Sequence, residues 1–146
     1  MRSASEVESA VADDSVLVID ARSPERFAGD SEPIDRVGGH IPGAMNHYYG
    51  TNLRDDGTFA DAEDLRERFT RTLAGHHSDN VVCYCGSGVT ACHNLLAMSH
   101  AGLPGAALYV GSWSEWSSDA RRPVETGPAR DNYAPDRGAT MAEKKS

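Results

Sequence analysis

Three short apolar runs, separated from one another by helical patterns, are the feature that most restricts the fold of this chain. They cover residues 16–19, 81–84 and 107–110. Short apolar runs rich in β-branched residues are typical of strands that are buried on both faces of a parallel sheet. We therefore predict three buried strands at these positions.

Helical patterns alternate with these runs. Leu65, Phe69 and Leu73 recur every four residues, which places them on one face of a helix. Gly102 follows the last helical pattern, and glycine there is typical of a helix C-terminus. In that last helix we expect apolar contacts from Leu95, Leu96 and Met98. The predicted helices cover residues 5–12, 61–74 and 91–100.

The alternation of strands and helices predicts an α/β fold, with a mostly parallel sheet covered by helices on both faces. In such sheets, ligands bind beyond the carboxyl ends of the strands. Cys85 directly follows the predicted strand 81–84. It therefore lies where a functional site is expected.

The size and composition of the chain indicate one globular domain. The chain has 146 residues, of which 39% are hydrophobic and 25% charged, an ordinary balance for a folded domain. From residue 128 onward the sequence is polar and rich in Asp, Arg, Gly, Pro and Lys. We predict a domain over residues 1–127 and a poorly ordered tail over 128–146.

The charge and the ends of the chain restrict partners and location. A net charge of −8 argues against nucleic acid, because phosphate binding needs clustered Lys and Arg. No apolar run approaches the length of a membrane span, and the N-terminus does not resemble a secretory signal. We therefore expect a cytoplasmic protein with no membrane partner.

Cysteine spacing argues against disulfides and against a metal. Cys83, Cys85 and Cys92 lie within ten residues of one another, and an odd number of crowded cysteines is a poor disulfide framework. Cys83 and Cys85 are too close for the usual zinc pair, and no second pair exists. We expect no metal site, and one reactive thiol in a reducing compartment.

The loop that begins at Cys85 suits a reactive thiolate. Gly86 and Gly88 allow the backbone to turn so that N–H groups point toward the sulfur. A helix that begins near Thr90 adds partial positive charge, which favours the anion by about 0.3–2 kcal/mol. Ser87 and Thr90 supply hydroxyls for hydrogen bonds to the sulfur or to a substrate.

The loop alone leaves alternatives open. Cys85 is equally compatible with a core cysteine at the end of a strand, because glycine-rich turns also serve packing. A phosphate-binding loop would carry a Lys that is absent here. A cysteine phosphatase has an Arg after five intervening residues, where this chain has Ala91.

Three separated segments together resemble the rhodanese family of sulfurtransferases. They are Gly-His-Ile-Pro-Gly-Ala at 39–44, the loop Cys-Gly-Ser-Gly-Val-Thr at 85–90, and Tyr-Val-Gly-Ser-Trp-Ser-Glu-Trp at 109–116. Their order and spacing fit the family, and the similarity spans residues 3–127. The resemblance implies a five-stranded parallel sheet flanked by helices, and an enzyme that needs no cofactor.

The resemblance also implies a substrate and a set of site residues. The loop is similar to that of the branch that uses 3-mercaptopyruvate, with thiosulfate as the slower donor. In this branch, a sulfur-carrying cysteine and a loop serine act in catalysis, and an arginine after the first strand binds the substrate carboxylate. A second substrate-binding arginine of the family follows about ten residues later in the chain. The corresponding catalytic residues are Cys85 and Ser87, and the substrate-binding residues are Arg26, Arg36, Gly86, Gly88, Val89 and Thr90.

Other polar and aromatic residues have structural interpretations. We expect Arg22 to brace the loop beside Asp20, His40 to be a structural loop residue, and Trp113 and Trp116 to be packing residues. The thiols of Cys83 and Cys92 are expected in the core, and Cys92 is the candidate that would resolve an oxidised Cys85.

The predicted function is transfer of sulfane sulfur from 3-mercaptopyruvate, or from thiosulfate, through Cys85 to a thiol or cyanide. A persulfide relay that is fed by a partner protein, or a rhodanese-like interaction module, is the alternative. In tandem members of the family, an aspartate of another domain joins the catalytic relay. Either a second rhodanese domain or an acid within this chain would have to supply it here.

Overall fold

A computed structural model describes residues 1–12, 15–33, 35, 37–86 and 90–128 of the chain. Its centre is a parallel sheet with the strand order β2-β1-β3-β4. The strands are β1 (Leu17–Asp20), β2 (Met45–Asn46), β3 (Val81–Tyr84) and β4 (Ala107–Leu108). β1 is the central partner and pairs with β2 on one side and β3 on the other.

The sheet has four strands within the described residues, where the family resemblance implied five. A single parallel bridge between Arg2 and Tyr109 lies beside β4, and the N–H of Arg2 donates to the carbonyl of Leu108 at 2.8 Å. The edge position next to β4 is therefore occupied by one bridge and not by a full strand.

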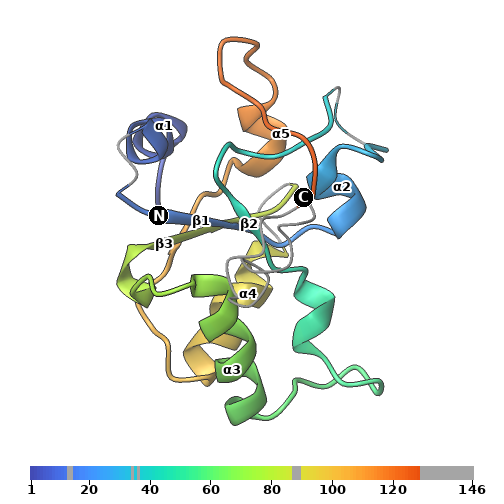
Figure 1. Cartoon of the computed structure of the whole chain (residues 1–146), viewed down its shortest axis with the longest axis vertical. Helices are drawn as coiled ribbons and strands as arrows, with labels where there is room; N and C mark the ends of the chain where they lie inside the picture. Colours follow the sequence, from blue (N-terminus) through green and yellow to red (C-terminus); the bar gives the residue numbers. More distant parts are fainter. Residues whose placement is uncertain (13–14, 34, 36, 87–89, 129–146) are drawn as a thin grey trace, which may run out of the picture.

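Helices cover both faces of the sheet, as predicted. Helices α1 and α5 lie on one side of β1 and β3, and α3 and α4 lie on the other (Figure 1). The short α2 follows β1 at its carboxyl end. The helices are α1 (Ala4–Ala12), α2 (Pro24–Ala28), α3 (Ala62–Leu73), α4 (Ala91–His100) and α5 (Ser112–Trp116), with 3-10 turns η1 (Tyr49–Asn52) and η2 (Ser78–Asn80).

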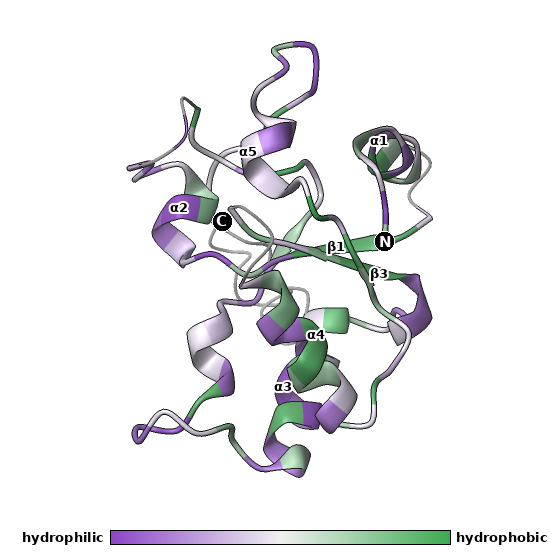
Figure 2. Ribbon diagram, turned by 180° about the vertical axis from the view of Figure 1, so that it is seen from behind, coloured by the Kyte–Doolittle hydropathy of each residue, from purple (hydrophilic) through white to green (hydrophobic). Residues whose placement is uncertain are grey.

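Alternate residues of the strands feed two separate apolar cores. In β1, Leu17 and Ile19 join the core under α3 and α4, while Val18 joins the core on the opposite face. Side chains alternate between the faces of a strand, so both faces of β1 and β3 must be apolar. Figure 2 shows these strands as a hydrophobic band through the middle of the molecule.

Helices α3 and α4 confirm most of the pattern that predicted them. Leu65, Phe69 and Leu73 are buried, and Gly102 has the left-handed φ of 80° that its position after α4 requires. The N–H of Leu103 then donates to the carbonyl of Met98 at 2.8 Å, as in a Schellman motif. The prediction for Leu96 is wrong: its side chain is 60% exposed because it lies on the outer face of α4.

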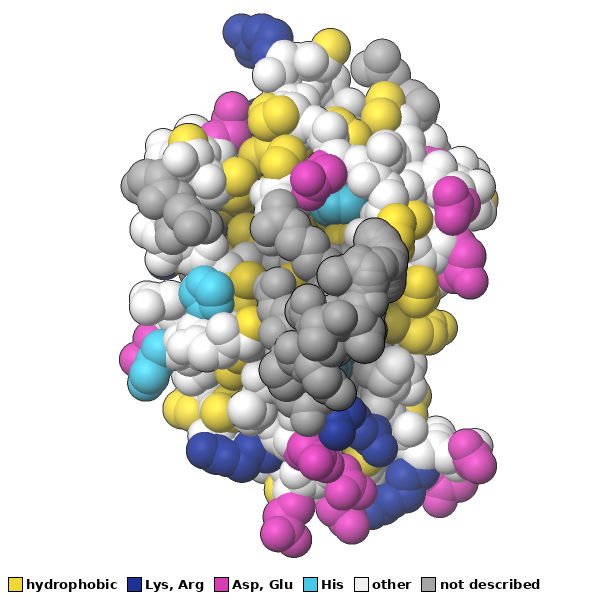
Figure 3. Space-filling model, viewed as in Figure 1, with side chains coloured by type: hydrophobic (Ala, Val, Ile, Leu, Met, Phe, Trp, Pro, Cys, Tyr) yellow, Lys and Arg dark blue, Asp and Glu magenta, His cyan; other side chains and the backbone are white. Residues whose placement is uncertain are grey.

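The outer surface of α3 is strongly charged. Exposed acidic and basic side chains gather at the lower end of the molecule, where α3 lies (Figure 3). Arg71 pairs with Glu67 one turn earlier, and Arg54 pairs with Asp61. Such exposed pairs add little stability, so α3 is held mainly by its buried face.

The segment after α5 returns to the body of the domain. His40 and Glu125 form an antiparallel bridge, and the N–H of Gly127 donates to the carbonyl of Ala28 at 2.9 Å. Of the predicted tail, only Pro128 lies within the described residues. None of the helices in the described part of the chain is long and apolar enough to cross a membrane.

Candidate active site

A cavity of about 420 Å³ lies where β1, β2 and β3 end. Its walls come from the residues that follow these three strands and from the starts of α4 and α5. This is the edge of the sheet at which a ligand is expected. The lining residues are Arg22, Ser23, Arg26, Asp35, Tyr48, Tyr49, Cys85, Gly86, Thr90 and Ser114.

Cys85 is fixed in this cavity by the start of α5. Its N–H donates to Ser112 Oγ at 3.1 Å, and its carbonyl accepts from the N–H of Trp113 at 2.8 Å. Ser112 Oγ donates in turn to the carbonyl of Tyr109 at 2.9 Å. The residue is only 1% exposed and lines the cavity.

Gly86 brings the backbone close to a guanidinium group. Its carbonyl accepts from the N–H of Ser114 at 2.9 Å. A Cβ at this position would lie 3.5 Å from Nη2 of Arg26. Because Gly86 has no side chain, the space between its Cα and the guanidinium group of Arg26 stays open.

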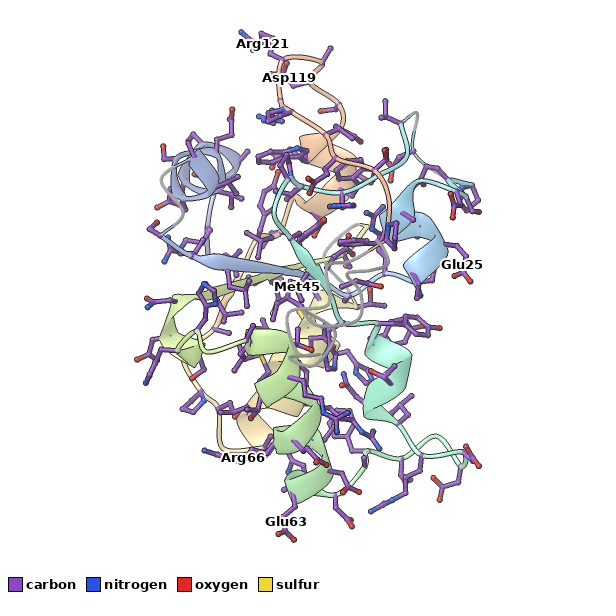
Figure 4. The ribbon with its side chains drawn as sticks, viewed as in Figure 1. Glu25, Met45, Glu63, Arg66, Asp119 and Arg121 are labelled. Atoms are coloured by element: carbon purple, nitrogen blue, oxygen red, sulfur yellow. The ribbon has the colours of Figure 1, made fainter. Side chains whose placement is uncertain are left out.

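Helix α2 aims Arg26 into the cavity. Ser23 caps the helix by accepting from the N–H of Arg26 at 3.4 Å, and Gly29 ends it with a left-handed φ of 88°. Arg26 Nη2 donates to Glu32 at 3.0 Å and lies 3.8 Å from Asp35. The neighbouring Glu25 points away from the molecule (Figure 4).

Asp35 is a lining residue that the sequence analysis did not identify. Its Oδ1 accepts from Ser114 Oγ at 2.8 Å, across 79 positions of the sequence. Its Oδ2 is buried and has no hydrogen-bond partner among the described residues. Ser114 lies inside the segment 109–116 that resembles the family. Asp35 lies next to Arg36 but outside the three family-like segments, so no motif signal indicated it.

Four of the predicted site residues meet at this cavity: Cys85, Gly86, Thr90 and Arg26. Thr90 is the N-cap residue of α4, so the predicted helix start is confirmed. The remaining predicted residues, Arg36, Ser87, Gly88 and Val89, lie outside the described residues.

Arg22 occupies the bracing position predicted for it. Its guanidinium donates to both oxygens of Asp20 at 2.8–3.1 Å and to the carbonyl of Gly39 at 2.5 Å. It also lies 4.9 Å from the ring centroid of Trp113. This buried arginine therefore connects the end of β1 to the early family segment, residues 39–44.

His40 is a structural loop residue, as expected. It stacks on Phe27 with the ring centroids 3.6 Å apart. Its Nδ1 lies 2.6 Å from the carbonyl of Phe27, and its Nε2 lies 3.1 Å from Glu125. Trp113 and Trp116 are fully buried packing residues.

A second buried polar cluster lies between β2, α3 and α4. His47 contacts Thr72 at 2.8 Å and Asn52 at 2.9 Å, and Asn52 donates to Asn94 at 2.7 Å. Burial lowers the pKa of His47 to about 4. The imidazole is therefore neutral at physiological pH and serves as a hydrogen-bonding link between elements.

The two other cysteines differ from each other. Burial raises the pKa of the Cys83 thiol to about 12, which makes it a core thiol, as predicted. Cys92 is exposed, so its predicted place in the core is wrong. It lies on the outer face of α4, one turn before Leu96.

Comparison with known proteins identifies the family. The rhodanese-like domain model matches residues 3–119 of the chain. The chain therefore belongs to the rhodanese-like family.

Two bacterial relatives match over most of the chain. A probable 3-mercaptopyruvate sulfurtransferase of Pseudomonas aeruginosa is 55% identical over 112 residues, which is 77% of this chain and 39% of the relative. A putative thiosulfate sulfurtransferase of Mycobacterium tuberculosis is 50% identical over 117 residues, 78% of this chain and 39% of the relative. The chain thus spans about two fifths of the length of these relatives.

The fold is also shared with a solved structure. The Tum1 protein of Saccharomyces cerevisiae superposes with a TM-score of 0.75 at 27% identity, over 88% of this chain and 47% of that protein. This agreement supports the arrangement of sheet and helices described above.

Proposed function

We propose that this protein is a sulfurtransferase that carries sulfane sulfur as a persulfide on Cys85. The observation that carries the proposal is that Cys85, Gly86 and Arg26 line one cavity at the carboxyl ends of the strands. A thiol nucleophile with an adjacent open glycine and a fixed cation suits an anionic sulfur donor. The names of the bacterial relatives support the same activity.

The reaction has two balanced steps. The Cys85 thiolate attacks the sulfur of 3-mercaptopyruvate, a sulfur–sulfur bond forms, and the carbon–sulfur bond breaks. The pyruvate enolate leaves and takes up a proton, so that pyruvate and a Cys85 persulfide result. An acceptor thiolate or cyanide then attacks the outer sulfur, the sulfur–sulfur bond breaks, and the Cys85 thiolate is regenerated.

Arg26 is the residue to which we assign the donor carboxylate, because a guanidinium group pairs well with a carboxylate. Gly86 leaves room for the donor beside it, and Thr90 closes the cavity at the start of α4. We keep Ser87 as a catalytic residue, and Arg36, Gly88 and Val89 as substrate-binding residues, on the strength of the family resemblance.

We propose 3-mercaptopyruvate as the preferred donor and thiosulfate as the slower one. The residues after Cys85 are Gly86 and Ser87, where thiosulfate-preferring members carry basic side chains. With fewer cations at this position, the doubly charged thiosulfate gains less than a donor with one carboxylate.

Partners and location belong to the same proposal. The partners are the small sulfur donor, a thiol or cyanide acceptor, and a second rhodanese domain that completes the site. The three cysteines are free thiols, which supports a reducing compartment such as the cytoplasm.

Replacement of Arg26 tests the donor site. Arg26→Gln removes the charge that binds the carboxylate, so we expect kcat/KM for pyruvate release to fall at least about tenfold, mostly through KM. Arg121→Gln is the matched control, because Arg121 is exposed on the loop after α5 (Figure 4). If the two variants retain equal activity, Arg26 does not bind the donor.

The choice of donor is tested in the same assay. We expect pyruvate release from 3-mercaptopyruvate to be faster than sulfite release from thiosulfate at equal concentrations. The reverse order would overturn the choice of donor and leave the sulfurtransferase proposal in place. If neither donor turned over while a partner protein's persulfide loaded Cys85, a relay would replace the enzyme.

A further inference from the structure

We propose that Asp35 is a specificity-determining residue that selects sulfur acceptors with a cationic group close to their thiol. This inference rests on the proposed function, because it concerns the second step of the transfer. It names aminothiols as the acceptor class that Asp35 favours over thiols of similar reactivity that lack a cationic group.

In the part of the chain that the structure describes, Asp35 has weaker ion pairing than the two neighbouring carboxylates, Asp20 and Glu32. Two guanidinium groups are shared among three carboxylates within the described residues. Asp20 lies 2.8 Å from Arg22, and Glu32 lies 3.0 Å from Arg26. Among the described residues, the nearest cation to Asp35 is the same Arg26 at 3.8 Å, so these ion pairs match the negative charge of Asp35 only in part.

The surroundings of Asp35 keep this charge effective inside the cavity. Oδ1 accepts one hydrogen bond from Ser114, while Oδ2 is buried without a hydrogen-bond donor among the described residues. The side chain is 12% exposed, so water screens it weakly. A charge in such a concave, poorly solvated place acts over several ångströms on whatever enters the cavity.

Two tyrosines favour the same kind of ligand. Tyr48 and Tyr49 line the cavity with Asp35 and Cys85, and their rings pack edge to face with centroids 5.0 Å apart. Aromatic rings attract ammonium groups that lie over their faces. An acceptor with an ammonium group therefore gains from Asp35 and from the rings as its thiol approaches the persulfide.

Arg26 and Asp35 together complement a zwitterion better than a simple anion. An acceptor with both a carboxylate and an ammonium group places the first near Arg26 and the second near Asp35. For an acceptor with a carboxylate alone, the attraction of Arg26 is opposed by the repulsion of Asp35. We therefore predict that aminothiols react faster than neutral or anionic thiols, after correction for their intrinsic reactivity.

The first experiment measures the charge preference of the cavity without sulfur transfer. The purified chain is treated with methanethiosulfonates that carry an ammonium, a neutral or a sulfonate group, and labelling of Cys85 is followed by peptide mass. Exposed Cys92 of the same molecule corrects for the reagents. We expect the ratio of the ammonium to the neutral reagent rate at Cys85 to exceed that at Cys92.

The variant Asp35→Asn removes the charge and keeps the shape. We expect the corrected ratio at Cys85 to fall about tenfold in this variant, as for the loss of one weakly screened charge. Asp30→Asn is the matched control, because Asp30 is exposed five positions earlier, and its ratio should stay within about twofold of the parent. If Asp35→Asn fails to fold, the comparison of the reagent rate ratios at Cys85 and Cys92 in the parent protein still tests the proposal. Equal ratios at the two cysteines would overturn it.

The second experiment tests the acceptor directly. The Cys85 persulfide is formed, excess donor is removed, and its discharge is timed with cysteamine, 2-mercaptoethanol and 3-mercaptopropionate. We expect Asp35→Asn to slow cysteamine about tenfold, leave 2-mercaptoethanol unchanged and accelerate 3-mercaptopropionate. A uniform loss for all three thiols would make Asp35 a structural residue only.

The two experiments separate the two proposals. If Cys85 takes no sulfur but its reagent ratio depends on Asp35, the proposed function fails and the charge selection stands. If Cys85 loads and discharges sulfur but neither readout changes in Asp35→Asn, the proposed function stands and the charge selection by Asp35 fails.

Discussion

At the scale of single residues, the backbone around Cys85 depends on Ser112. Ser112 has a φ of 54°, a conformation that costs a non-glycine residue about 1–2 kcal/mol. Its hydroxyl links Cys85 and Tyr109 in the interior. The strain is offset by these two hydrogen bonds, which hold Cys85 at the edge of the cavity.

Replacement of this hydroxyl is predicted to affect both stability and reactivity. Ser112→Ala removes the hydroxyl that accepts the buried N–H of Cys85, which costs about 1–3 kcal/mol of unfolding free energy. Persulfide formation at Cys85 should also slow. Ser118→Ala is the control, because its hydroxyl makes a similar bond to the carbonyl of Glu115 on the surface. Equal urea midpoints for the two variants would contradict this role.

His47 gives the protein a stability that depends on pH. The pKa of its imidazole is about 4 in the folded protein and about 6.5 in an unfolded chain. The unfolded state therefore binds the extra proton first, and stability falls as the pH drops from about 6.5 to 4, by about 3 kcal/mol.

The variant His47→Gln isolates this contribution. It removes the titrating group, so the difference in unfolding free energy between parent and variant should shrink as the pH falls through this window. Urea unfolding at pH 7, 5.5 and 4.5 measures it. A difference that stays constant across these values would show that His47 does not titrate as described.

At the scale of elements, the early family segment and the chain after α5 stabilise each other. Gly39 has a φ of 115°, and a Cβ there would lie 2.6 Å from the carbonyl oxygen of Glu125. This close approach places His40 and Glu125 in their bridge. Gly43 also has a left-handed φ, of 81°, but a Cβ there would meet no atom within 4 Å.

The two glycines make a matched pair of variants. Gly43→Ala should cost about 1 kcal/mol, the cost of the backbone conformation alone. Gly39→Ala should cost at least about 2 kcal/mol more, because Glu125 must move and the bridge opens. Thermal unfolding of both variants measures the difference, and similar losses would refute the contact between Gly39 and Glu125.

The elements that the sequence predicted are those with a long local pattern. The apolar runs of β1 and β3 and the four-residue period of α3 are visible without tertiary information. The two residues of β2 carry no such pattern, since their pairing with β1 alone defines them. Helix α2 is only five residues long, although Ser23, Pro24 and Gly29 are typical start and stop signals.

The site was predictable only in part, because some of its residues meet through contacts between segments that are far apart in the sequence. Cys85 and Gly86 were visible because they follow a strand within one motif, and Arg26 because of the family resemblance. Asp35 and Ser114 approach each other across the fold, and nothing local in either segment indicates that contact. Their pairing needs the three-dimensional arrangement of α5 against the loop after α2.

At the scale of the whole molecule, the domain extends past the residues that the family model matches. The match ends at residue 119, but Glu125 and Gly127 still pair with His40 and Ala28. We therefore propose residues 1–127 as the folding unit. The remaining polar segment, 128–146, is proposed as a poorly ordered tail.

The central claim is that Cys85 carries the sulfur, and intact mass after incubation with 3-mercaptopyruvate tests it most directly. We predict a gain of about 32 Da, one sulfur atom, together with pyruvate release. Both should be absent in Cys85→Ser and retained in Cys92→Ser. A gain that persists in Cys85→Ser, or pyruvate release without any gain in the parent protein, would contradict the account.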